Sequence, residues 1–159
     1  MLNHFLGMHK YETWASSLTI DSIDTVPQSA RNSPQFLRAI QVMAHIQIAR
    51  RVWLARLKNE AWRVDDWFPA WPIADSRREA LELDNAWSSF LASLSGADLS
   101  MACRYTSSEG VRYESSISDI IAHVLNHSTY HRGQIARLVS EAGGRRAGTD
   151  LIAMTRRQL

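Results

Sequence analysis

Apolar side chains recur at three- and four-residue steps over four long segments, and this period constrains the fold more than any other feature of the chain. The clearest segment begins at Ser33-Pro34, where the serine can accept from free backbone amides and the proline fits the first helical position. The helical period then continues to about Lys58. Comparable segments cover about residues 2–22, 76–94 and 116–142. The sequence therefore predicts four helices long enough to form a bundle.

Capping signals indicate where two of these helices begin and end. Ser76 and Glu79 have the spacing of a capping box, so we expect the third helix to begin there. Ser116 and Asp119 are spaced in the same way before the fourth segment, and the pair Gly143-Gly144 is expected to end it.

The two connections that flank the third helix differ in character. Residues 61–75 contain three tryptophans and two prolines, which predicts a loop that covers an opening or an edge of the core. Residues 99–115 alternate apolar and polar side chains on both sides of a turn at 107–110, which predicts a hairpin. The expected fold class is all-α, a four-helix bundle with a short β-hairpin between helices three and four. We expect a single domain over residues 1–159.

Composition argues against several classes of protein. One cysteine, Cys103, cannot form an intramolecular disulfide and fits a reducing compartment. No apolar run approaches the roughly 18 residues of a membrane span, and the first ten residues lack the pattern of a signal peptide. The net charge of +2 is too small to predict nucleic-acid binding by itself. We therefore expect a cytoplasmic protein that does not bind membranes.

The fourth helix carries His123, His127 and His131 at four-residue intervals, and therefore on one face. Neutral imidazole is a common metal ligand, and two histidines four residues apart can bind one ion. At about 1.5 Å rise per residue, the first and last of the three lie roughly 12 Å apart, too far to share an ion. The pair is therefore either His123 with His127 or His127 with His131.

His45 is the candidate for a third ligand. It lies in the middle of the second predicted helix with Val42, Ala49 and Val52 at helical intervals around it, so we expect its ring to point inward. Such a histidine, taken alone, is more often a hydrogen-bonded core residue than a ligand. Together with the histidines of the fourth helix, it describes a site of three nitrogens with positions open for water or substrate.

The stretch from His123 to Gln134, preceded by the predicted hairpin and by residues 118–121, resembles the signature of the DinB/YfiT-like family of metalloenzymes. Further points of resemblance, in the same order along the chain, are Tyr11, Trp14, His45 and residues 148–152. The resemblance covers nearly the whole chain. It implies a four-helix bundle that binds a divalent metal ion through one histidine of helix two and two of helix four.

By position, the resemblance assigns the metal to His45, His127 and His131. His123 then either borders the site as a proton-shuttling group or is a hydrogen-bonded structural histidine, which is the interpretation we favour. We call His123, His127 and His131 the histidine ladder. His4 and His9 lie far before it in the sequence, and we expect both on the surface.

Three imidazoles carry no charge, so a divalent ion bound to them lowers the pKa of a coordinated water to about 7 and deprotonates a coordinated thiol. Two reactions follow, hydrolysis and the transfer of a thiol to an electrophile. Some relatives in the superfamily that this chain resembles are thiol transferases or thiol-dependent isomerases, so the resemblance favours the second reaction and a low-molecular-weight thiol as cosubstrate. Zinc is the metal we expect first, and nickel next.

The catalytic residues stay unidentified, because no carboxylate is spaced to lie beside the histidines. Some arginines could hold the carboxylates of an anionic thiol. The candidates are Arg50, Arg51, Arg132 and Arg137. For most of them we favour the simpler interpretation of exposed, solubilising charge.

Two alternatives to an enzyme stay open. One is a metal-binding or protein-interaction module without catalysis, with the tryptophan-rich stretch 62–71 as its interface. The other is nucleic-acid binding, because residues 132–157 carry a local net charge of +4, but no recognition motif accompanies the charge. The main prediction is a homodimeric, metal-dependent enzyme that uses a three-histidine site to activate a thiol or water against a small-molecule substrate.

Overall fold

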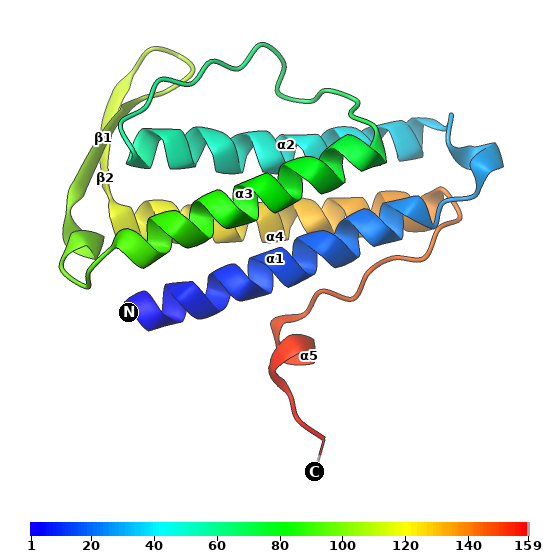
Figure 1. Ribbon diagram of the computed structural model, residues 1–159. Coiled ribbons are helices and arrows are strands. Elements are labelled where there is room, and N and C mark those ends of the chain that lie inside the picture. Colours follow the sequence, from blue (N-terminus) through cyan, green and yellow to red (C-terminus); the bar gives the residue numbers. More distant parts are fainter. Residues whose placement is uncertain (159) are drawn as a thin grey trace.

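Four long helices form the body of the molecule in this computed structural model, which describes residues 1–158 (Figure 1). They are α1 (Leu2–Asp24), α2 (Pro34–Leu57), α3 (Ile73–Ser93) and α4 (Ile117–Glu141). An antiparallel hairpin of β1 (Ala102–Thr106) and β2 (Arg112–Ser116) links α3 to α4. The short elements are the 3-10 turns η1 (Gln28–Ala30) and η2 (Asp98–Ser100) and the helix α5 (Leu151–Thr155). The expected fold class is confirmed.

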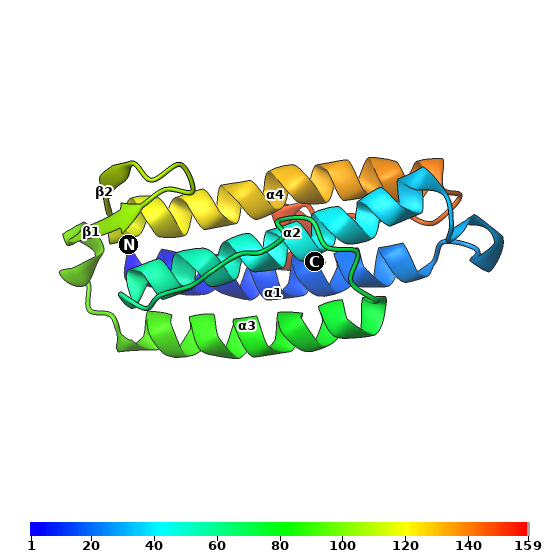
Figure 2. The same ribbon diagram turned by 90° about the horizontal axis from the view of Figure 1, so that it is seen from above.

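The direction of the helices explains why one connection is long. α2 and α3 run the same way along the bundle, opposite to α1 and α4 (Figures 1 and 2). The segment 58–72 must therefore return along the length of α2 before α3 can begin. α2 packs against α4 and α3, while α1 packs against α3 and α4. None of these helices, over residues 1–158, has the length and hydropathy needed to cross a membrane.

Local capping places the starts of α2 and α4 where the sequence predicts them. The Ser33 hydroxyl accepts from the backbone amide of Phe36 at 3.2 Å, and Ser116 accepts from that of Asp119 at 3.0 Å. The prediction that the third helix begins at Ser76 is wrong. This helix begins at Ile73, because Pro72 fixes a backbone angle that leads directly into a helix, and Ser76 is buried inside its first turns.

The core consists of two apolar clusters separated by a polar layer. One cluster includes Ile23, Met43 and Val139 at the end of the bundle where α2 begins. The other includes Leu83 and Trp87 at the end near the hairpin. The residues buried between these clusters include Glu12, Gln47, Arg50, Ser128 and Arg132. The middle of the bundle is therefore its polar part, and the candidate site lies at that level.

Candidate metal centre

Three histidines meet where α2 faces α4. His45 comes from the middle of α2, and His127 and His131 come from consecutive turns of α4. One ring nitrogen of each lies within 4.8 Å of the corresponding nitrogens of the other two. The ring centroids are 5.1 Å apart for His45 and His127, 4.7 Å for His45 and His131, and 4.4 Å for His127 and His131. The structure thus brings together the three predicted site residues, in an arrangement that could hold a metal ion.

Hydrogen bonds orient two of the three rings. Nδ1 of His45 lies 3.1 Å from the backbone oxygen of Trp67, and Nδ1 of His131 lies 3.0 Å from Oε1 of Gln134. Because an amide oxygen only accepts, each Nδ1 carries the proton and each Nε2 keeps its lone pair. Nε2 of His45 faces Nε2 of His127 at 3.2 Å. The lone pairs are therefore available on the side where the rings converge.

The long connection between α2 and α3 covers one side of this group. Phe68 stacks on the ring of His45, with centroids 4.2 Å apart and planes 12° from parallel. The guanidinium carbon of Arg38 lies 4.5 Å from the centroid of the Phe68 ring. The tryptophan-rich segment lies along α2 and over His45 (Figure 1), in agreement with the expectation that it covers an edge of the core.

Burial keeps the histidines in the form that binds metal. Burial, and after it the neighbouring His131 and His45, together lower the pKa of His127 to about 4. Burial also lowers the pKa of His45, with His131 as the second cause. Both imidazoles are therefore neutral at physiological pH, and a neutral imidazole can offer a lone pair to a cation.

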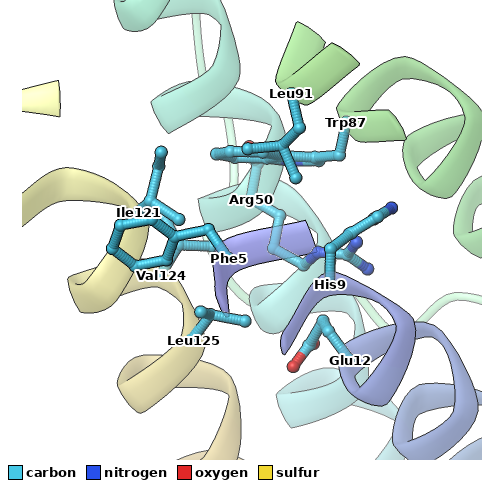
Figure 3. Close-up of a pocket in the computed structure, with 9 residues that line it drawn as sticks. All are labelled: Phe5, His9, Glu12, Arg50, Trp87, Leu91, Ile121, Val124 and Leu125. Atoms are coloured by element: carbon cyan, nitrogen blue, oxygen red, sulfur yellow. The ribbon is translucent and has the colours of Figure 1, made fainter. Parts of the chain in front are cut away.

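Two buried ion pairs lie in the polar layer behind the histidines. Arg132 donates from Nη1 to Oε2 of Glu12 at 2.6 Å, and both side chains are 2% exposed. Arg50 donates from Nη2 to Oδ1 of Asp84 at 2.7 Å. Glu12 and Arg50 lie with His9 at one side of a small cavity of about 10 Å³, whose other walls are apolar (Figure 3). These pairs link α1 to α4 and α2 to α3 at the level of the site.

Three of these residues correct the sequence analysis. His9 was expected on the surface, but it is buried, and its Nε2 lies 3.2 Å from the backbone oxygen of Asp84 and 3.0 Å from the hydroxyl of Ser88. Exposed charge was expected for most of the four candidate arginines, but Arg50 and Arg132 are buried. The reason is that their carboxylate partners lie on other helices, where no local pattern reveals them.

The remaining arginine candidates and His123 lie elsewhere. Arg51 pairs with Glu79, and Arg137 is exposed and lies 3.5 Å from Glu141. All four arginines proposed from the sequence thus have a carboxylate partner. His123 is exposed, with its ring centroid 5.2 Å from the ring of Trp53 and 5.7 Å from that of His127. No hydrogen bond to its ring occurs within residues 1–158, so its role stays a prediction.

Sequence reasoning missed the residues that orient the rings. Gln134 lies three positions after His131, a spacing at which helical side chains meet, so the spacing itself could have identified it. Trp67 contributes a backbone atom and Phe68 a ring face from a connection without regular structure. No sequence pattern indicates that such a connection passes over His45.

Comparison with known proteins agrees with the fold. The family model described as the DinB family matches residues 1–158. The protein DinB of Bacillus subtilis (strain 168) is 22% identical over 154 residues, which cover 90% of this chain and 88% of that protein. The family match spans the four long helices, the hairpin and all three converging histidines. The chain belongs to the DinB family.

Proposed function

We propose that this protein is a metal-dependent enzyme in which His45, His127 and His131 hold one divalent ion that activates a thiol or a water molecule. The convergence of three imidazoles, with ligand nitrogens within 4.8 Å of one another, is the observation that carries this proposal. A protein that used these histidines only for packing would have no need to aim their lone pairs at a common point.

The chemistry of the donor set supports a bound cation. The Nε2 atoms of His45 and His127 face each other at 3.2 Å, and two lone pairs at that distance repel unless a proton or a cation lies between them. Two nitrogens bound to one tetrahedral zinc ion, each at about 2.1 Å, lie about 3.4 Å apart, which is close to the separation found here. All-imidazole ligation suits zinc, and nickel next.

A divalent ion held by three neutral imidazoles keeps its full charge and lowers the pKa of a coordinated thiol or water. The chain's own residues prepare the ring nitrogens for this role. The Trp67 carbonyl and the Gln134 amide hold protons on Nδ1 of His45 and His131, so that both Nε2 atoms stay free. Phe68 shields one face of His45 from water. Family relatives that transfer thiols favour a low-molecular-weight thiol as cosubstrate.

The test is turnover by protein loaded with zinc or nickel. Small thiols are offered with 1-chloro-2,4-dinitrobenzene as the electrophile, and 4-nitrophenyl acetate is offered for hydrolysis. We expect turnover above the rate of the free ion in the wild type and in His4→Ala, whose histidine is exposed on α1. We expect it to be lost in His127→Ala.

Two outcomes would overturn the proposal that this protein is an enzyme. A protein that binds the ion but accelerates neither reaction beyond the free ion would be a metal-binding module without catalysis. A protein that takes up no ion would favour the interaction module with its tryptophan-rich interface. The expected homodimer is tested separately by sedimentation equilibrium, and the expected cytoplasmic location by fractionation.

A further inference from the structure

Arg56, at the hairpin end of α2, is an arginine near the histidine ladder for which the structure of residues 1–158 provides no carboxylate partner. Arg56 lies in the last turn of α2 and forms no ion pair with any of residues 1–158, whereas Arg50, Arg51 and Arg132 each pair with a carboxylate. The Arg56 side chain is partly buried, and this burial lowers the pKa of its guanidinium. An arginine remains charged at neutral pH even so. The protein thus holds a partly desolvated cation with no anion of its own.

Aromatic rings fix the position of this guanidinium. Its central carbon lies 4.6 Å from the ring centroid of Trp53 and 5.1 Å from that of Tyr105. One hydrogen bond, from Nη2 to the backbone oxygen of Thr106 at 3.0 Å, joins it to the hairpin. A guanidinium has five N–H donors in a planar fork, so most of its donors remain available to a ligand.

Arg56 lines a groove of about 290 Å³ between α2, the hairpin and the long connection. Trp53, Trp67, Tyr105 and Tyr113 supply aromatic walls, and two serines of the hairpin turn supply hydroxyls. Arg56 is the only charged residue among those that line it. An apolar, aromatic groove with one fixed cation favours a small organic anion with a flat body.

Two residues that line the groove connect it to the histidine group. Trp67, which lines the groove, is also the residue whose backbone oxygen accepts from Nδ1 of His45. Trp53, on the opposite wall, contacts His123, whose ring in turn lies beside that of His127. Trp67 thus stands between the groove and His45, and Trp53 and His123 stand between the groove and His127.

We propose that this groove binds a small carboxylate with a flat, apolar body. Its carboxylate is held by Arg56, and its body lies against the aromatic walls. We further infer that such carboxylates are the substrates of the candidate metal centre. Only this second step rests on the proposed function. Binding of the anion itself requires no metal ion.

The first experiment measures calorimetric binding of 2-naphthoate and of its uncharged analogue 2-naphthamide to the metal-free chain. We expect the carboxylate to bind about 10-fold more tightly than the amide in the wild type, the ratio expected of one charge-assisted contact. Arg56→Gln should abolish this preference. Arg112→Gln, which removes the same charge from an exposed position of the hairpin outside the groove, should preserve it.

Equal affinities for the carboxylate and the amide in the wild type would overturn the proposal. So would an unchanged preference in Arg56→Gln. Because Arg56 also bonds to the hairpin, its replacement could disturb the groove itself. The wild-type comparison needs no variant, so it tests the proposal even if Arg56→Gln does not fold.

The second experiment separates this inference from the proposed function. Cobalt(II) is added, and the proton relaxation rates of bound 2-naphthoate are measured in the wild type and in His127→Ala. We expect faster relaxation in the wild type only, with the same naphthoate affinity in both. Cobalt uptake without faster relaxation would overturn the substrate assignment. Absence of cobalt uptake with retained naphthoate binding would support the groove and overturn the metal-dependent enzyme.

Discussion

A single proton on Nδ1 decides whether each histidine of this group can offer Nε2 to a metal ion. For His45 that proton is held by the backbone oxygen of Trp67, which no side-chain substitution removes. For His131 it is held by the side chain of Gln134, so this bond can be tested by mutation. His127 lies beside both of the other rings, and burial is the main reason why it stays neutral.

Replacing Gln134 with leucine should weaken zinc binding by about 10- to 100-fold, because His131 then loses the acceptor that fixes its tautomer. Gln134→Glu keeps an acceptor at the same position and should bind zinc about as tightly as the wild type. Competition with a chromophoric chelator measures both affinities. If Gln134→Leu binds like the wild type, the ring of His131 is not oriented by this contact.

The low pKa of His127 makes the stability of the metal-free protein depend on pH. Its pKa is about 4 in the folded state and about 6.5 in an unfolded chain, so between these values the unfolded state binds the extra proton. The free energy of unfolding should therefore fall as the pH drops from 6.5 to 4. His127→Gln should show a shallower fall in urea denaturation at a series of pH values. Parallel curves for the two proteins would contradict a depressed pKa.

At the level of elements, buried ion pairs set how the helices lie against one another. Glu12 on α1 and Arg132 on α4 are bonded to each other and enclosed. Arg132 also donates to the hydroxyls of Tyr11 and Thr129, and Glu12 accepts from Ser16. Nε of Arg132 is the one nitrogen of its guanidinium that is buried without a hydrogen-bond partner within residues 1–158. Each charge is balanced by the other, so removing one member leaves a buried charge without its partner.

Glu12→Gln should lower the free energy of unfolding by about 3–5 kcal/mol, because it leaves Arg132 buried without its partner. The double variant Glu12→Leu/Arg132→Met removes both charges and should lose less than the single variant. Urea denaturation of the wild type, Glu12→Leu, Arg132→Met and the double variant completes the cycle. Additive losses would show that the two side chains do not act as a pair.

At the scale of the whole molecule, sequence and structure agree where the signals are local. Ser33-Pro34, the capping serine Ser116 and the alternation around the hairpin turn each act within a few residues, and the structure confirms them. The four-residue ladder on α4 likewise needs only one helix. Local signals therefore predicted the bundle and the histidine ladder on α4. The spacing left two pairs of ligands open, and the family resemblance selected His127 and His131.

The features that the sequence did not predict depend on how distant segments pack, which a single sequence does not reveal. His9 and Arg50 are buried because Asp84 of α3 accepts a hydrogen bond from each of them, through its backbone oxygen from His9 and through its carboxylate from Arg50. The path of the long connection over His45 follows from the parallel run of α2 and α3, not from the composition of the connection. Ser76 fitted a capping box, yet Pro72 began the helix one turn earlier.

A metal ion shared by α2 and α4 should stabilise the whole bundle, since an ion that binds only the folded state shifts the unfolding equilibrium. Zinc at about 100 times its Kd should raise the free energy of unfolding by about 2.7 kcal/mol. Thermal or urea denaturation with and without zinc measures this gain. His131→Ala should show no such gain, and an equal gain in that variant would place the stabilising ion elsewhere.

The most direct test of the metal centre is the metal content per chain. Protein purified without a histidine tag or chelator is loaded with zinc, dialysed and analysed for metal, alongside alanine variants of all four histidines of the ladder and α2. We predict about one ion per chain in the wild type and in His123→Ala, and none in His45→Ala, His127→Ala or His131→Ala. Full metal content in His127→Ala, or its loss in His123→Ala alone, would contradict the assignment of the three converging histidines as the metal ligands.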